Sequence, residues 1–425
     1  MDLKKFFTII ILVLAIGKNS FAQSIDELTV NLDDKESCKK YIAAVSAETV
    51  KLLCEENLPP APDYGLLCRA VEKFSDGKNV VILDEVGYPS IMVKIPAFKI
   101  TSGIHPMFKV KGKNYSCVYF SKYENIIFHG RAYSLPDVEP ATNLDIDEAR
   151  QVCAVKGRGW HLASDIEYGG IALLCANQGF YPHGNTNTHI SENFYPNEHG
   201  RVVVEKRAPD GKLLIRKTAT GSGPVTWAHD GTEHGIYDLN GNVWEMAEGL
   251  RLINGEIQVL RDNDGVLPEC WNDWKAIDKL GKLVKVGSKN TWKFDSTKGD
   301  SLNKFQLIEG ATPFLSLQRK ISMYPPEDTN RNYGYVTCKF KDLRSDKNLK
   351  VPAILRLHSV FPFDDKIILT DDVLWIRNYG TRRVMKGGIW GYSAGMFGAS
   401  FAGAWNDSSP GMGFRSAFID LEKRG

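Results

Sequence analysis

Apolar positions recur with two different periods along this chain, and the change of period separates helical from extended stretches. Between residues 33 and 57 they return every three or four positions, which predicts a helix that ends before the proline-rich segment 58–65. From Tyr88 onward, YPSIMVKIPAFKI and then YSCVYFSKYENIIF alternate apolar with polar positions, as half-buried strands do. Helical spacing returns over 145–155 and again over 164–177.

Shorter signals refine this division. Ser164 stands three residues before Glu167, a capping-box pattern at the start of the second of these two helices. The segment RVVVEKRAPDGKLLIRK predicts a hairpin that turns at Pro209–Asp210–Gly211. From about 253 to 375 the pattern weakens, and we interpret these residues as an insertion into the main domain.

The N-terminal 22 residues have the character of a signal peptide. Lys4 and Lys5 precede the apolar run FFTIIILVLAIG, and Ser20 and Ala22 occupy the small-residue positions of a cleavage site after Ala22. The run is shorter than the roughly 20 residues needed to span a bilayer. We therefore expect an exported chain without a membrane span, located in the periplasm, at the cell surface or in the medium. Residues 23–87 then form a partly helical appendage, and 88–425 form the main domain.

The net charge and the cysteine spacing limit which partners and which cysteine-based sites are expected. The 425 residues carry 53 basic and 51 acidic side chains, a net charge of +2, which gives no electrostatic reason to expect nucleic acid as a partner. None of the eight cysteines belongs to a CxxC pair, so a zinc or thioredoxin-like site is not expected. Disulfides and free thiols both remain open for them. The cysteines are Cys38, Cys54, Cys68, Cys117, Cys153, Cys175, Cys270 and Cys338.

Three islands of sequence resemble one known family when taken in order. GRGWHLASDIEYGGIA begins at residue 157, GIYDLNGNVWEMAEG at 235, and RVMKGGIW at 383 with a closing GFRSAF that ends at 418. Together they resemble the formylglycine-generating enzyme (sulfatase-modifying factor) superfamily. SKYENI, GRAYSLP, TGSGPVTWAHDGT and LRLINGEIQVL are most similar to variable proteins of diversity-generating retroelements. The resemblance implies an α+β, C-type lectin fold with twisted antiparallel strands, two helices and much irregular structure.

In such proteins the last stretch is the diversified ligand-binding surface, which here corresponds to about 385–415. The resemblance and the composition of this stretch together give a set of candidate ligand-binding residues. Tyr392 and Trp405 are the expected aromatic anchors, and the small residues between them are expected to open a groove. The full candidate set is Ile389, Gly391, Tyr392, Gly398, Ser400, Ala402, Gly403, Trp405 and Asp407.

Other residues of the same islands are expected to hold the frame. Gly387 and Gly388 suit a backbone with positive φ or a close approach, with the Trp390 ring buried beneath them. Trp244 is expected to be a core ring. Glu245 is expected to be a buried carboxylate, for which Arg415 is a bidentate partner.

Catalytic and metal-dependent functions receive little support. The family's oxidases use cysteines close to the C-terminus, and this chain has none after Cys338, so we expect no enzyme activity. The nine histidines form no HxxxH or HxH pair, which disfavours an iron site. Asp262 and Asp264 slightly resemble a calcium loop but lack its downstream glutamate, so we expect no cofactor and keep calcium only as a minor alternative.

These expectations combine into one functional hypothesis. The chain is expected to be a non-catalytic, exported, adhesin-like display protein, diversified by a retroelement, that binds a protein or glycan target on another cell or surface. Two alternatives stay open: an oxidase or sulfur-transfer enzyme of the same superfamily, and a structural component of a secreted or phage assembly. The sequence leaves the oligomeric state and the identity of the ligand open.

Overall fold

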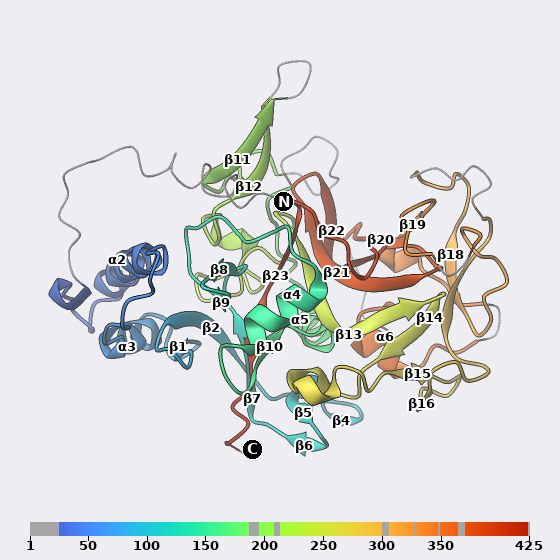
Figure 1. Cartoon of the computed structure of the whole chain (residues 1–425), viewed down its shortest axis with the longest axis horizontal. Coiled ribbons are helices and arrows are strands. Elements are labelled where there is room, and N and C mark those ends of the chain that lie inside the picture. The colour runs from blue at the N-terminus through green and yellow to red at the C-terminus, as the bar shows by residue number, and fades with distance from the viewer. Residues whose placement is uncertain are drawn as a thin grey trace.

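The computed structural model describes residues 25–423 apart from 187–194, 208–212, 300–305, 327–328, 347–348 and 364–369. Within this part it contains five helices and several sheets, so the predicted α+β class is confirmed (Figure 1). The predicted signal peptide, residues 1–22, lies outside the described residues. None of the described helices is long and apolar enough to cross a membrane.

A five-stranded sheet joins the two ends of the described chain. Its order is β1-β2-β7-β24-β10, so the last strand lies between two strands from the first half of the chain. β1 precedes residue 88 and pairs antiparallel with β2. The strands are β1 Asn79–Leu83, β2 Pro89–Pro96, β7 Cys117–Ser121, β10 Trp160–Leu162 and β24 Ser416–Phe418.

Two helices of the N-terminal segment lie beside β1 and β2 (Figure 1). They are α2 Lys35–Leu53 and α3 Gly65–Phe74. The helix predicted over 33–57 is confirmed, and the Asp34 side chain caps it by accepting from the Glu36 backbone N–H at 3.0 Å. Apolar side chains of both helices join one core cluster with β2 and with residues that follow β7.

The two helices predicted in the main domain are also confirmed. They are α4 Ile146–Ala154 and α5 Asp165–Gln178, and each begins with a capping box. In α5 the Ser164 hydroxyl accepts from Glu167 N, and the Glu167 carboxylate accepts from Ser164 N. α5 packs against β13 and β22 of the large sheet described next, and against the short helix α6 Ala353–Leu357.

The large sheet has eleven strands, with the central order β16-β15-β14-β13-β21-β22-β20-β19. β17 pairs with β14 and β18, and β23 pairs in parallel with β13. Residues 253–375 supply β14 to β19. Of these, β14, β15 and β16 extend the sheet beyond β13, and β19 extends the opposite edge beyond β20. Its strands are β13 Trp244–Ile253, β14 Glu256–Val259, β15 Lys275–Ile277, β16 Leu283–Lys285, β17 Lys293–Ser296, β18 Pro313–Ser316, β19 Val336–Lys339, β20 Val373–Ile376, β21 Thr381–Ile389, β22 Tyr392–Phe401 and β23 Met412–Phe414.

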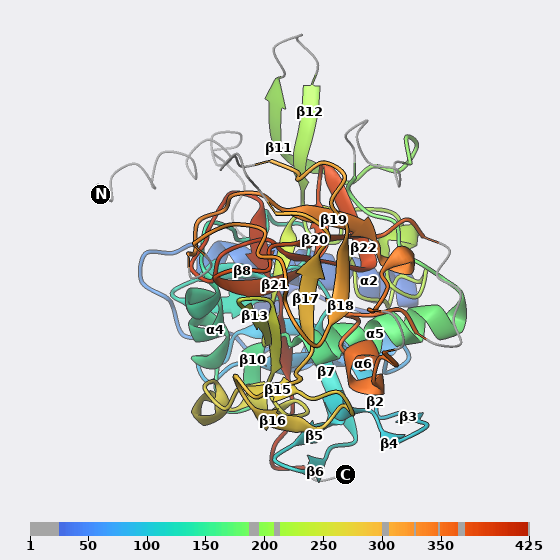
Figure 2. The same ribbon diagram turned by 90° about the vertical axis from the view of Figure 1, so that its right-hand side faces the viewer.

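Short hairpins form separate two-stranded sheets outside the two larger ones. The predicted hairpin is confirmed as β11 Val202–Arg207 and β12 Leu213–Thr218, which project from the rest of the molecule in both views (Figures 1 and 2). Its predicted turn at 209–211 lies outside the described residues. The others are β3 Lys99–Ile100 with β4 Gly103–Ile104, β5 Lys109–Val110 with β6 Lys113–Asn114, and β8 Ile126–Phe128 with β9 Arg131–Tyr133.

One residue separates β23 from β24, and it is Arg415. The chain therefore passes from the large sheet to the five-stranded sheet within a few residues. The stretch predicted as a continuous strand over 115–128 is also interrupted, because Lys122–Asn125 leave the sheet between β7 and β8. Both interruptions place buried polar side chains, among them Glu124, Asn125 and Arg415.

Candidate ligand-binding site

A groove of about 340 Å³ opens where the ends of β13, β20, β22 and β23 meet. It includes part of the stretch 385–415, which the resemblance marks as ligand-binding, and four of the nine candidate residues line it. Its lining residues are Trp244, Asn332, Tyr335, Trp375, Arg377, Met385, Ser400, Ala402, Gly403, Asp407 and Met412.

Aromatic rings form one wall of the groove. Trp244 and Trp375 meet edge to face, with ring centroids 5.4 Å apart and planes at 88°. The expectation that Trp244 is a core ring is wrong, because its side chain is only half-buried and lines the groove. Successive side chains of a strand point to opposite faces, and Glu245 takes the inward position next to it.

Short side chains at the end of β22 create the hollow opposite these rings. Ser400, Ala402 and Gly403 all line it, and each has little or no side chain beyond Cβ. A Cβ at position 403 would lie 3.3 Å from the Met385 methyl carbon, so even an alanine there would press on its neighbour. The small residues therefore set the depth of the groove.

Polar groups hold the walls in place. Asp407 Oδ2 accepts from Asn332 Nδ2 and from the Ala404 backbone N–H, both at 2.7 Å. Arg377 Nε donates to the Tyr333 carbonyl oxygen at 2.6 Å, and its Nη1 donates to the carbonyl of Ala402. Burial lowers the pKa of Arg377 from its ordinary value. These bonds tie β20 and the segment around residue 332 to the end of β22.

The other candidate residues lie elsewhere. Ile389 and Gly391 are at the tip of the β21–β22 hairpin, and Gly398 is buried within β22. The Tyr392 backbone pairs with Ile389, and the side chain of Tyr392 lies outside the described residues.

Trp405 does not line the groove either. Its Nε1 donates to Asp147 at 3.1 Å, its ring lies 4.8 Å from the Arg150 guanidinium, and it meets Trp274 edge to face at 6.1 Å. A ring held by three partners in this way packs against the α4 side of the domain. It therefore lies beside the groove and does not serve as an anchor within it.

The sequence did not point to four of the groove residues. Asn332, Tyr335, Trp375 and Arg377 lie within or next to the weakly patterned stretch 253–375. The available signal was the alternation in β20, where Leu374 and Ile376 are buried and Trp375 faces out. That period identifies an exposed ring but says nothing about which strand lies beside it.

The glycine pair in β21 has the expected backbone. Gly387 and Gly388 adopt φ of +83° and +101°, and a Cβ at Gly387 would lie 2.9 Å from the Leu239 carbonyl oxygen. The expected burial of Trp390 is wrong. Its side chain is half-buried at the hairpin turn, 5.5 Å from the Arg216 guanidinium, because the turn carries it away from the core.

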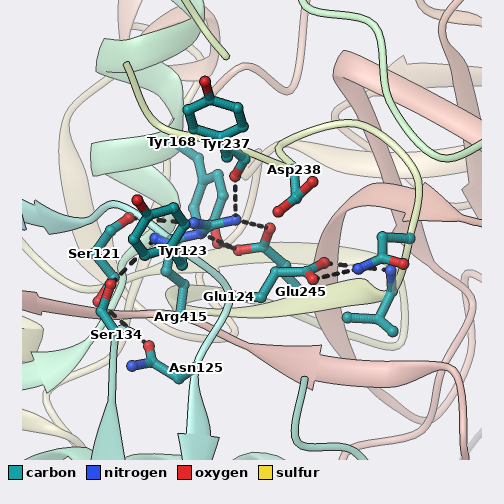
Figure 3. A network of polar contacts seen from close by, with 12 residues as sticks. Ser121, Tyr123, Glu124, Asn125, Ser134, Tyr168, Tyr237, Asp238, Glu245 and Arg415 are labelled. Carbon is teal, nitrogen blue, oxygen red and sulfur yellow. Dashed lines mark hydrogen bonds and ion pairs between the residues drawn. The ribbon is translucent and has the colours of Figure 1, made fainter. Parts of the chain in front are cut away.

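A buried polar network is centred on Arg415 (Figure 3). Its Nε donates to Glu245 Oε2 at 2.8 Å and its Nη2 to Glu245 Oε1 at 2.7 Å, which confirms the predicted bidentate pair. The same guanidinium donates to the carbonyl oxygens of Ser121 at 3.1 Å and Tyr237 at 2.8 Å. Arg415 thus connects β13, the end of β7 and the loop before β13.

Two more carboxyl groups face this network. Burial raises the pKa of Glu124 well above its ordinary value and raises that of Asp238 to about 6. Glu124 Oε2 accepts from Asn242 Nδ2 at 2.5 Å, and Asp238 Oδ2 accepts from the Gly221 N–H at 2.7 Å. These carboxyl groups are buried and do not line the groove, so we assign them to the frame.

In the part of the chain that the structure describes, no group of three or more His, Cys, Asp or Glu residues is placed so that it could hold a metal ion. In the loop that resembles a calcium site, Asp264 Oδ1 accepts the backbone N–H of Lys111 at 2.5 Å. That carboxylate therefore serves a turn contact.

Comparison with known proteins identifies no family for this chain. No protein-family model matches the chain, and no curated protein sequence matches it. The family resemblance therefore rests on the three sequence islands alone.

Proposed function

We propose that this protein is a non-catalytic, exported, ligand-binding protein with a C-type lectin fold of the formylglycine-generating-enzyme type. Its C-terminal surface, about 385–415, binds a protein or glycan on another cell or surface. The observation that carries the proposal is the groove in which the small residues Ser400, Ala402 and Gly403 face the Trp244 and Trp375 rings.

The groove has the composition of a recognition site. Ligand pockets combine mostly apolar, aromatic walls with a few polar groups that orient the ligand. Here Trp244, Trp375 and Tyr335 supply the aromatic area, and Asn332 and Asp407 supply polar groups at its edge. Arg377 and Asp407 already hold the walls in place through hydrogen bonds. Little conformational entropy would therefore be lost when a ligand binds.

The surroundings of the groove support variation without loss of fold. Gly387, Gly388 and the Glu245–Arg415 pair form the frame, whereas Asn406 and Ser408 are exposed next to the groove. Substitutions at exposed positions usually change stability by less than about 0.5 kcal/mol. Such a frame suits a surface diversified by a retroelement, as the sequence resemblance implies.

The test is a binding screen of the full chain on a glycan array and on a peptide-display library, followed by measurement of Kd for the best ligand. We expect Trp375→Ala and Trp244→Ala each to weaken that ligand by at least about 1 kcal/mol, or roughly fivefold. Trp271→Ala, another half-buried tryptophan outside the groove, is the matched control and is expected to leave Kd unchanged. Absence of any ligand, or an unchanged Kd in both groove variants, would contradict the proposal.

A further inference from the structure

A second cavity, of about 400 Å³, lies where the N-terminal helices meet the main domain. α2 and α3 contribute one wall, and the rest of the lining comes from β1, β2, the segment that follows β7, Pro136 and the stretch 221–237. Its apolar lining includes Ile42, Val71, Phe74 and Ile91, and Val225, 40% exposed, lies at its mouth. Residues from both sides of position 88 are thus needed to build it.

Lys122 is the buried cation of this cavity. Its side chain lines the cavity although the residue is only 4% exposed. Nζ donates to Asn79 Oδ1 at 2.8 Å and to the Glu233 carbonyl oxygen at 2.6 Å. Both acceptors are neutral, and among the described residues no carboxylate forms an ion pair with Lys122. An ammonium has three N–H donors, so one is left for a further acceptor.

The charged groups around Lys122 are occupied with other partners. The Glu233 carboxylate pairs with Lys39 at 2.5 Å, and the Asp230 carboxylate accepts from the Thr232 hydroxyl at 2.9 Å. Burial lowers the pKa of Lys122 to about 7, against the opposing effect of Asp230 and Glu233, and Lys39 lowers it further. His234 is a further titratable group nearby, and its pKa is lowered by burial and by Lys122.

A buried ammonium without a counter-charge is unfavourable, and an anion that enters the cavity would remove that cost. The tyrosine rings of Tyr123 and Tyr237 lie 5.7 and 6.0 Å from Nζ and line the same cavity, so they limit access of water to the amine. The remaining lining is mostly apolar, and its other charged side chains, Lys39 and Glu233, are partly exposed and pair with each other.

We propose that this cavity is a second binding site, separate from the groove, for a small carboxylate with an apolar body. The carboxylate pairs with Lys122, and the apolar body lies against Ile42, Val71 and Phe74. The inference does not depend on the proposed function of the C-terminal surface. It gives the N-terminal helices a role, since they form the wall that covers the ligand.

Two measurable consequences follow. A ligand that binds only the folded chain stabilises it by RT ln(1 + [L]/Kd), so Tm rises with ligand concentration. Pairing with a carboxylate raises the pKa of Lys122, so at pH 7 binding takes up about half a proton per ligand, since the free amine is then about half neutral.

The experiment uses octanoate as the probe and the full chain, with octanol as a neutral analogue of the same length. Isothermal titration in two buffers of different ionisation enthalpy gives Kd and the proton uptake. We expect octanoate to bind, and Lys122→Met to weaken it by about tenfold or more while changing octanol binding by less than about threefold. Lys40→Met, an exposed lysine of α2 that does not line the cavity, is the matched control.

A second variant covers the case in which Lys122→Met fails to fold. Ala43→Trp places a bulky ring at an exposed position of the cavity lining and is expected to block octanoate without disturbing the core. No octanoate binding at millimolar concentration would overturn the proposal. Equal binding by wild type and Lys122→Met, or by wild type and Ala43→Trp, would overturn it as well.

Discussion

The guanidinium of Arg415 lies among three buried carboxyl groups, and its two hydrogen bonds with a carboxylate both go to Glu245. Among the described residues, Glu124 and Asp238 form no ion pair of their own. Asp238 Oδ1 has no hydrogen-bond partner there, although the atom is buried. The network therefore holds more potential negative charge than Arg415 compensates, which favours a bound proton.

We expect Asp238→Asn to change how stability depends on pH. Burial raises the pKa of Asp238 to about 6, from an ordinary 3.8, so between these values the folded chain holds a proton that the unfolded chain has lost. The contribution of this group to the free energy of unfolding therefore falls as pH rises from about 4 to 6. In Asp238→Asn that fall is absent, which urea denaturation at several pH values would show.

Asp137→Asn is the matched control. Asp137 has the same φ of +62° as Asp238 but is exposed, so asparagine tolerates the backbone equally well at both positions. Parallel pH profiles for wild type and Asp238→Asn would contradict the assignment of this proton.

At the scale of elements, the β21–β22 hairpin is irregular, and its irregularities fit particular neighbours. The register shifts on both sides of Gly387. Further along, Gly395 adopts a φ of +72° beside the buried carboxylate of Asp372. Asp372 Oδ2 accepts from the Phe397 N–H at 2.8 Å, which links the residue before β20 to β22. The hairpin is therefore held in place at the edge of the groove.

We expect Gly395→Ala to destabilise the fold strongly. A Cβ there would lie 1.9 Å from the Asp372 carboxyl carbon, so Asp372 has to move and its hydrogen bond is lost. Gly249→Ala is the control, because Gly249 has a φ of +83° with nothing within 4 Å of its Cβ position. Gly249→Ala is expected to cost about 1 kcal/mol, and Gly395→Ala at least about 2 kcal/mol more in urea denaturation. Equal costs would show that the contact with Asp372 is not limiting.

At the scale of the whole molecule, no disulfide joins the two sheets in the part of the chain that the structure describes, which includes every cysteine. All eight cysteines are free thiols, and they are distributed over both helices of the N-terminal segment and the main domain. Burial raises the pKa of Cys175 and Cys338 to about 12, which suppresses their thiolates. The two sheets are instead joined by the chain crossing at Arg415 and by its contacts.

We expect eight reactive thiols in denaturant without reductant, counted with a chromogenic disulfide reagent. In the folded chain Cys54 is expected to react first, because it is the exposed one and lies just after α2. Cys54→Ser is expected to remove this fast phase and leave seven thiols in denaturant. A count below eight in the wild-type chain would mean that disulfides form and that the free-thiol arrangement is wrong.

Local patterns predicted a large part of this structure. The helix at 33–57, the helices α4 and α5, the capping box of α5, and the β11–β12 hairpin all follow from spacings of a few residues. The Glu245–Arg415 pair was predictable too, because a buried carboxylate needs a donor and few side chains supply two in a plane.

The sequence by itself therefore determined the helices α2, α4 and α5, the β11–β12 hairpin, the Gly387–Gly388 and Glu245–Arg415 parts of the frame, and the small residues of the C-terminal stretch. Only the tertiary structure decided which side chains meet around the groove. The turn carried Trp390 outward, Glu245 took the inward position beside Trp244, and residues 332–377 supplied four of the eleven residues that line the groove. Likewise only the fold brought Lys122 into one cavity with residues of α2 and α3. Periodicity reports on near neighbours along the chain, whereas a cavity depends on which distant segments pack together.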